Sequence, residues 1–301
     1  MWFKNVQLFH LTEDFEYDAE QLAEKLAERP FRACQSTQLS SIGWISPLGE
    51  DHDQLVMSAD GALALSACHE VKVLPASVVS RKAKERIKAE EARTGAKLKK
   101  QQKDEIRQDV LFELLPKAFT KLTTTQLLID PKKGWIIVDA ASRKKAEEIL
   151  SLLRETLESL PVKPPETEQH VGSTMTDWLK YDAPQGFELE GDCELKEQGA
   201  PGVIRIKAQD LLSQEIRAHI EGGMQVTKLA LTWSGAYAEP RLSFVLDYDL
   251  SIKSLKFLDN VALEMDEVDI DSLEMEYDTR LSIMTGEFRI LIPEVLKQFG
   301  G

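Results

Sequence analysis

Cysteine is scarce in this sequence. The 301 residues include 3 cysteines, Cys34, Cys68 and Cys193, and none of them belongs to a C-x-x-C pair. Cysteines so far apart indicate neither a disulfide framework nor a zinc site. We interpret them as small buried apolar side chains and expect no bound metal.

Long apolar runs are missing as well. No segment approaches the roughly 20 consecutive apolar residues that a membrane-spanning helix needs. The opening MWFKNVQLFHLTEDF lacks the basic and then apolar layout of a secretory signal. The sequence therefore predicts a cytoplasmic protein with no membrane partner.

Common enzyme signatures are absent too. The sequence contains no G-x-x-x-x-G-K-[ST] phosphate loop, no G-x-G-x-x-G dinucleotide turn, and no G-x-S-x-G or H-E-x-x-H motif. Potential metal ligands adjoin in Asp51-His52-Asp53, which a solvated turn explains as well. We predict a protein that is not an enzyme and uses no cofactor. The alternative of a hydrolase or nuclease would need clustered carboxylates, for which the acidic residues 264–278 are the candidate.

The charge of the chain is unevenly distributed. The formal net charge is −14, which would repel phosphate at long range. Residues 81–121, however, hold 13 Lys and Arg against 7 Asp and Glu, a local excess of six positive charges. An acidic protein with one basic segment can hold DNA at one surface and repel it elsewhere.

Residues 1–77 show the alternation of strands and one helical pattern, and we predict an N-terminal α+β part. The predicted elements are a strand over 3–11, a helix over 17–29, turns at 44–49 and Asp60-Gly61, a hairpin of 54–58 with 62–68, and a short strand over 71–74.

Residues 78–123 are predicted to form a basic helical arm. The sequence from 78 to 108 favours helix but has too few apolar positions for a continuous buried stripe. Gly95 interrupts this pattern, either as a kink or as the break between two helices. The apolar positions Ile106, Val110 and Leu114 then form a helical face that ends before Pro116. The arm should therefore project into water and be anchored at its ends.

The arm carries the residues that point to nucleic acid. A lysine cluster consists of Lys97, Lys99, Lys100 and Lys103. If residues 117–121 are extended, Lys117, Phe119 and Lys121 share one side, and an aromatic ring between two cations suits phosphates and a base or sugar face. A solvated charged helix and a phenylalanine in the core or at a subunit contact explain the same pattern.

The remaining chain is predicted to be mixed, so the fold class is α+β with antiparallel sheets and helices. Residues 124–162 should complete the central part and 173–301 should form a C-terminal α+β domain, with a proline-containing linker over 162–172. The predicted elements are a hairpin of 124–129 with 134–140, a helix over 144–160, strands over 187–195, 202–207, 225–233, 241–248 and 251–258, and helices over 211–220 and 288–299.

Several short blocks follow one another in the order of a known family, over nearly the whole chain. They are Trp2-Phe3-Lys4-Asn5, Gly43-Trp44, Lys72-Val73-Leu74-Pro75, Leu114-Leu115-Pro116-Lys117-Ala118-Phe119, Gly134-Trp135-Ile136-Ile137-Val138-Asp139, Lys144-Lys145-Ala146-Glu147, Gly202-Val203-Ile204-Arg205, Gln209-Asp210-Leu211, Val226-Thr227-Lys228-Leu229-Ala230-Leu231 and Met284-Thr285-Gly286-Glu287. None is a catalytic motif. On these blocks the chain resembles RdgC, a family of bacterial recombination-associated proteins.

The resemblance implies a homodimer closed into a ring, with basic residues around a hole wide enough for duplex DNA. It further implies sequence-independent DNA binding, association with the nucleoid, and restraint of RecA-promoted strand exchange. Duplex DNA is the expected ligand, and the binding of single strands is left open. A protein–protein regulator of recombination with incidental DNA affinity is the alternative, and it predicts contact with RecA in the absence of DNA.

The resemblance also places residues. The family's functionally important aromatic falls on Phe119, expected at a subunit contact or against DNA, with Lys117 beside it. A basic and polar site falls on Lys207 and Gln209, where Ala208 takes a position that is Lys in some relatives. By charge alone, Arg205 and Lys228 are further candidates for phosphate contacts.

Overall fold

The computed structural model describes residues 2–197, 199, 201–266 and 270–301. Over these residues the chain is α+β and is built on two antiparallel sheets, which confirms the predicted class. None of the described helices is long and apolar enough to cross a membrane.

The larger sheet has the strand order β2-β4-β5-β6-β1-β7, with β3 paired to β4. Its strands are β1 (Gln7–Leu11), β2 (Ser40–Ile45), β3 (Met57–Ala59), β4 (Ala62–Val73), β5 (Phe119–Asp130), β6 (Trp135–Val138) and β7 (Val162–Lys163). Asp60 and Gly61 both have positive φ, 51° and 76°, and form the two-residue turn between β3 and β4. This is the turn that an Asp-Gly pair favours. The hairpins predicted from β3 to β4 and from β5 to β6 are both confirmed.

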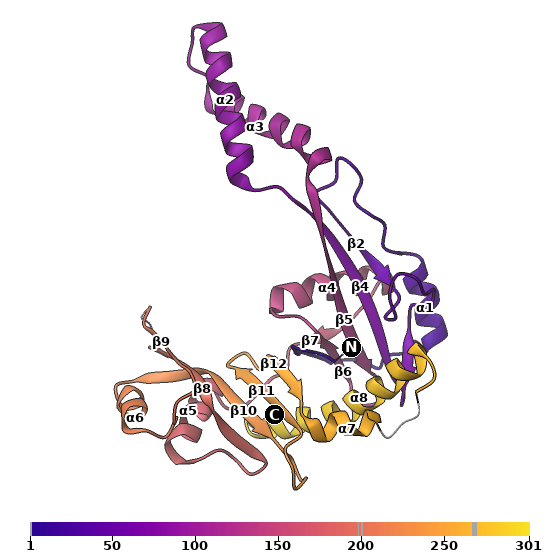
Figure 1. Ribbon diagram of the computed structural model, residues 1–301, viewed down its shortest axis with the longest axis vertical. Coiled ribbons are helices and arrows are strands. Elements are labelled where there is room, and N and C mark those ends of the chain that lie inside the picture. Colours follow the sequence, from indigo (N-terminus) through magenta and orange to yellow (C-terminus); the bar gives the residue numbers. More distant parts are fainter. Residues whose placement is uncertain (1, 198, 200, 267–269) are drawn as a thin grey trace.

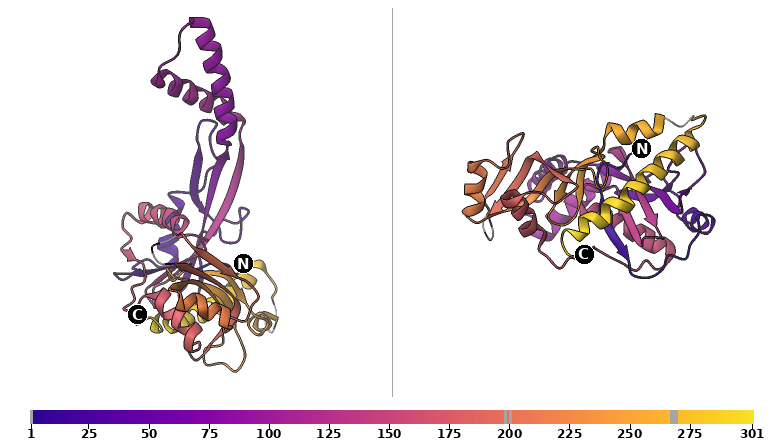
Figure 2. Two further views of the ribbon diagram at one scale, coloured as in Figure 1. Left: turned by 90° about the vertical axis from the view of Figure 1, so that its left-hand side faces the viewer. Right: turned by 90° about the horizontal axis from the view of Figure 1, so that it is seen from below.

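The smaller sheet has the order β12-β11-β10-β8-β9. Its strands are β8 (Phe187–Glu197), β9 (Val203–Ile206), β10 (Met224–Trp233), β11 (Leu242–Asp247) and β12 (Ile252–Phe257). Three helices cover its apolar face: α5 (Val171–Tyr181), α6 (Gln214–Glu221) and part of α8 (Leu273–Lys297). Figures 1 and 2 show these helices on the side away from the projecting arm.

Helices α1 (Ala19–Ala27) and α4 (Arg143–Leu157) cover one face of the larger sheet, and α8 lies on the other. Each helix begins at a side chain that accepts a hydrogen bond from a free backbone N–H: Asp18 for α1, Ser142 for α4 and Ser272 for α8. Residues of α8 pack against both sheets, so this helix belongs to the core that joins them.

The two sheets are also joined directly. Val6 and Ile252 exchange backbone hydrogen bonds of 2.7 and 3.0 Å, which links the start of β1 to β12. The Arg289 side chain of α8 donates to Asp130 at 2.6 Å and to the Asp60 carbonyl at 3.1 Å, so α8 is tied to two turns of the larger sheet.

Strands β4 and β5 run beyond the rest of the sheet as a two-stranded ribbon, with register maintained to Val73 opposite Phe119. The buried part of β5 ends at Thr125, and the residues nearer the arm are mostly exposed. Figure 1 shows helices α2 (Ala76–Thr94) and α3 (Lys100–Leu114) at the far end of this ribbon. We call residues 76–117, which include the short 3-10 helix η1 (Leu115–Lys117), the arm.

Several predicted elements were wrong in detail. Trp44 lies in β2 rather than in a turn, and it is buried because its indole packs on the core and donates to Thr156 at 2.9 Å. Residues 71–73 continue β4 and do not form a strand of their own. The last helix begins at Leu273 rather than at residue 288, since Ser272 caps it there. Helix α5 was not predicted, and the acidic stretch includes part of α7 (Asp259–Asp266), whereas its residues 267–269 lie outside the described residues.

Candidate nucleic-acid interface

The arm is a two-helix hairpin that turns at Gly95. The φ of Gly95 is 68°, in the left-handed region that glycine enters without a steric penalty, and its N–H donates to the Glu91 carbonyl at 3.0 Å. Of the two alternatives left open by the sequence, the structure therefore has the break between helices. The buried seam of the hairpin is narrow and includes Ala83, Ile87 and Val110.

Ion pairs reinforce this narrow seam. Glu113 of α3 accepts hydrogen bonds from Lys82, at 2.5 Å, and from Arg86, both on α2. The Lys82 hydrogen bond is the main reason why the pKa of Glu113 is lowered. Glu91 pairs with Lys103 at 3.0 Å, and this contact lowers the pKa of Glu91 in the same way. These pairs hold α2 against α3 and partly offset the charges of the three cations that take part, since Lys82 and Arg86 share one carboxylate.

The other cations of residues 81–121 form no ion pair between α2 and α3. Arg93 and Arg107 pair with Glu90 and Asp104 within their own helices. Eight side chains form no ion pair with any described carboxylate, while three carboxylates of the same segment, Glu85, Glu105 and Asp109, pair with no described cation. The eight are Arg81, Lys84, Lys88, Lys97, Lys99, Lys100, Lys117 and Lys121. The arm therefore presents a clear excess of uncompensated positive charge.

The predicted lysine cluster divides in two. Lys97, Lys99 and Lys100 are exposed around the start of α3, whereas Lys103 is half-buried and occupied by Glu91. Arg81, Lys84 and Lys88 were not among the site residues chosen from sequence, although their spacing of three and four places them on one face of α2. The helical repeat alone could have identified these three residues as a second basic cluster.

The extended segment predicted around Phe119 begins later than expected. Lys117 ends η1, so only Phe119 and Lys121 alternate in β5 on one side of the ribbon. The ring of Phe119 is 87% exposed and faces the same side as Val73, its cross-strand partner, which is 48% exposed. Phe119 is therefore not part of the core of this chain.

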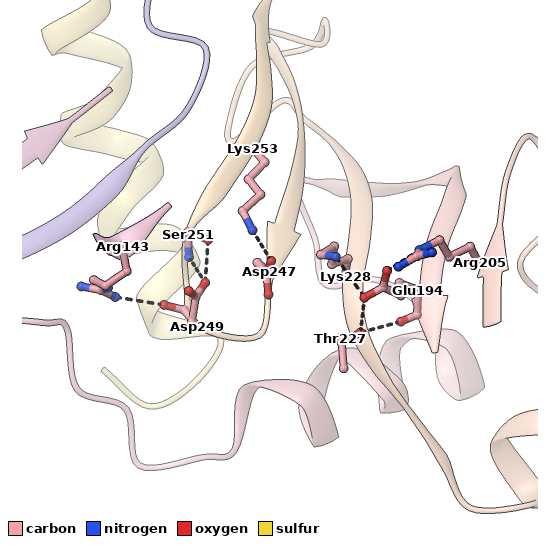
Figure 3. A network of polar contacts seen from close by, with 9 residues as sticks. All are labelled: Arg143, Glu194, Arg205, Thr227, Lys228, Asp247, Asp249, Ser251 and Lys253. Atoms are coloured by element: carbon pink, nitrogen blue, oxygen red, sulfur yellow. Dashed lines mark hydrogen bonds and ion pairs between the residues drawn. The ribbon is translucent and has the colours of Figure 1, made fainter. Parts of the chain in front are cut away.

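The cations on the smaller sheet form a row with carboxylates. Arg205, Glu194 and Lys228 lie opposite one another on β9, β8 and β10. Figure 3 shows both cations reaching the Glu194 carboxylate, at 2.9 Å from Arg205 and 3.0 Å from Lys228. Burial by itself would raise the pKa of Glu194, but the hydrogen bonds from Lys228 and Arg205 outweigh it and lower the pKa. Both predicted phosphate contacts are thus already engaged.

The row continues to the next strands. Asp247 of β11 lies opposite Lys228 and accepts a 2.5 Å hydrogen bond from Lys253 of β12 (Figure 3). Lys253 was not chosen from sequence, because only the pairing of β11 with β12 brings it to this row. Charges therefore alternate from Arg205 to Lys253 across the sheet, and cross-strand pairs of this kind stabilise it.

Lys207 and Gln209 lie just beyond β9 and are exposed. Ala208 between them has a φ of 50°, and its N–H donates to the Asp192 carboxylate at 2.8 Å. The Gln209 N–H donates to the Gly191 carbonyl at 3.0 Å, which fixes the turn against β8. Lys207 forms no ion pair with the described carboxylates, unlike Arg205 two residues earlier.

The acidic stretch was the sequence's candidate for a nuclease centre. Glu264 pairs with Arg241 at 2.7 Å, and Arg241 also binds the buried carboxylate Glu287. The described residues contain no group of three or more His, Cys, Asp or Glu side chains that could hold a metal ion. Residues 267–269 are outside that search.

Comparison with known proteins gives one family for the entire chain. Residues 1–301 match a family model described as "Putative exonuclease, RdgC". The "Recombination-associated protein RdgC" of Tolumonas auensis is 43% identical over 305 residues, which cover 100% of this chain and 99% of that protein. Proteins of the same name from Salmonella paratyphi B and Salmonella typhimurium are 40% identical over 305 residues, covering 100% of this chain and 98% of theirs. This chain therefore belongs to the RdgC family of recombination-associated proteins.

Proposed function

We propose that this protein binds duplex DNA without sequence preference, encircles it as a dimeric ring, and thereby restrains RecA-promoted strand exchange. The observation that carries the proposal is the set of eight uncompensated cations within residues 81–121, seven on the arm and Lys121 at the start of β5. Lys and Arg side chains of this kind neutralise backbone phosphates and release counterions, an interaction that does not depend on base sequence.

The charge pattern ranks the candidate contacts. Lys97, Lys99 and Lys100 meet phosphate without first losing a partner, and Lys207 does the same on the smaller sheet. Lys103, Arg205 and Lys228 must share their charge with Glu91 or Glu194, so each contributes less. The net charge of the whole chain is −14, and since residues 81–121 contribute an excess of six positive charges, the remainder carries −14 − 6 = −20. This acidic remainder directs DNA to the basic surface and supports association with the nucleoid.

Self-association is supported by an exposed apolar patch on the ribbon. Phe119, Val73 and Val71 are 87%, 48% and 40% exposed and lie on one side of β4 and β5. Apolar side chains gathered in this way mark a contact surface, and a second copy of the chain covers them in the proposed dimer. Figure 1 shows an L-shaped chain, with the arm on one limb and the smaller sheet on the other. Two such chains that meet at both ends enclose a hole for the duplex.

The test is fluorescence anisotropy of labelled duplexes of unrelated sequence, titrated with the protein across a series of salt concentrations. Light scattering on the same samples reports the mass of the protein. The proposal predicts equal affinity for all sequences, a steep loss of affinity with salt, and the mass of a dimer. No binding at low salt would reject the DNA-binding function and favour a protein partner instead.

A further inference from the structure

A groove lies between β3 and the first half of α8, at the end of the larger sheet away from the arm. Strand β3 pairs with the start of β4, whereas the arm follows the other end of that strand. Figure 1 shows the first half of α8 at the foot of the ribbon, far from α2 and α3. The volume of the groove is about 1240 Å³, above the usual range of small-molecule sites, which favours a segment of a macromolecule as its occupant.

The groove has apolar side chains on both of its walls. Val56 and Met57 line it on the side of β3, and Met275 and Ile283 line it on α8. Val56 and Met57 are buried and Ile283 is half-buried, but Met275 is 40% exposed. The groove therefore offers apolar contact to an occupant, with Met275 as the side chain that an occupant would newly cover.

The charged side chains of the groove are all acidic. The described lining contains no lysine or arginine, and its carboxylates are Asp60, Glu264, Glu274 and Asp278. Asp60 is already paired with Arg289. Glu264 is already paired with Arg241. Among the described residues, Glu274 meets only His52, at 3.8 Å, and Asp278 forms no ion pair, so these two charges remain for an occupant.

Glu274 and Asp278 lie one helical turn apart on the same side of α8. Like charges four residues apart repel each other across a turn of helix, and a cation near both of them removes this repulsion. A helix with Lys or Arg at the same four-residue spacing can place one cation beside each carboxylate. The groove between α2 and α3 differs in this respect, because its lining includes the cations Arg86 and Arg93.

We propose that this groove binds a basic amphipathic helix of a partner protein. Its apolar side chains lie against Met275 and Ile283, and its Lys or Arg side chains pair with Glu274 and Asp278, which is the usual way for such a helix to occupy a groove. The sign of the lining charge excludes a nucleic acid. The second basic cluster, on α2 of another copy of this chain, fits less well, because its surroundings offer only serine and charged side chains.

Fluorescence anisotropy with the full-length protein tests the groove. The probe is a labelled peptide of roughly four helical turns, made of leucine on one face and lysine on the other. We expect a Kd of about 100 μM or tighter. Glu274→Gln/Asp278→Asn should weaken binding by about fivefold and Met275→Ser by about threefold, and neither should disturb the core, since all three side chains are exposed. Glu105→Gln/Asp109→Asn on α3 is the matched control, because it removes two exposed carboxylates at the same spacing outside this groove.

A second peptide, with glutamate in place of every lysine, should not bind. Absence of binding by the leucine–lysine peptide, or equal binding of both peptides, would overturn the proposal. An equal loss of affinity in the groove variant and in the α3 control would overturn it too, since the peptide would then follow the overall negative charge of the chain. If light scattering showed salt-sensitive oligomers larger than a dimer that Glu274→Gln/Asp278→Asn abolishes, the occupant would be a second copy of this chain and not a partner protein.

Discussion

Phe119 lies directly opposite Val73 across the β4–β5 ladder, and both side chains face solvent in the single chain. This pair lies at the end of the ribbon next to the arm, where the residues of β5 are exposed rather than buried. With Val71, these two side chains form a contiguous exposed apolar patch, and such patches mark interaction surfaces. The pair therefore leads to the first prediction, which concerns self-association.

Phe119→Ala should weaken the dimer without unfolding the chain, because the ring contributes no core contact within one chain. Light scattering over a dilution series should show monomers at concentrations where the parent is a dimer. Tyr181→Ala is the matched control, since Tyr181 is 82% exposed on α5, away from the ribbon. Equal dimer affinity in the parent and Phe119→Ala would contradict a subunit contact at this position.

The double variant Lys99→Ala/Lys100→Ala should bind duplex DNA more weakly and with a shallower dependence on salt. If each lysine neutralises one phosphate, the slope of log affinity against log salt concentration should fall by about 1.8. Lys25→Ala/Lys163→Ala removes the same charge from the surface outside the arm and should leave the slope unchanged. An unchanged slope in the arm variant would clear these two lysines of phosphate contact.

Glu194→Gln should strengthen DNA binding at neutral pH, because it releases the charges of Arg205 and Lys228. Anisotropy titrations at fixed salt would measure the gain, which we expect to be severalfold. The combined variant Glu194→Gln/Arg205→Ala/Lys228→Ala should lose that gain. If Glu194→Gln bound no better than the parent, this face of the smaller sheet would lie away from the DNA.

The same carboxylate predicts a dependence of stability on pH. The pKa of Glu194 is lowered from its ordinary value of 4.5, so its contribution is complete above that value and is lost as the pH falls through the folded-state pKa. The free energy of unfolding should therefore fall less on acidification in Glu194→Gln than in the parent. Urea titrations from pH 7 to pH 3 would measure both curves, and parallel curves would show that the ion pairs add no stability.

Arg241→Met should destabilise the fold by about 3 kcal/mol, because it leaves the Glu287 carboxylate buried without its partner. The side chains of Arg241 and Glu287 are 11% and 4% exposed, so water replaces the lost contact poorly. Arg241→Met/Glu287→Leu should recover part of the loss. Urea unfolding at pH 7 would test both variants, and a loss below about 1 kcal/mol in the single variant would contradict a desolvated pair.

Local chemistry made much of this fold predictable. The Asp60-Gly61 turn and the apolar spacing of α4 are each determined within a few residues of sequence. Gly95 marked the position of an interruption, but the sequence did not decide between a kink and a break. Strand β2 was missed, because Ser40–Ile45 becomes a strand through pairing with β4, and that partner is distant in the sequence.

The candidate site shows the same division. The excess of cations in the arm is visible in the sequence, and so is the spacing of Arg81, Lys84 and Lys88. The ion pairs that Arg205 and Lys228 form with Glu194 are not visible there, because they depend on the register of three strands. Charge counted along a chain thus identifies a basic segment but does not show which of its charges are free.

Encirclement is the central claim, and retention on closed-circular DNA measures it most directly. The protein would be bound to a relaxed closed-circular plasmid and to the same plasmid linearised, then washed with salt high enough to release phosphate contacts. A ring should remain on the circle, leave the linear DNA by its ends, and be released from the circle when a restriction enzyme cuts it. Equal loss from circular and linear DNA would contradict encirclement and reduce the function to binding at an open surface.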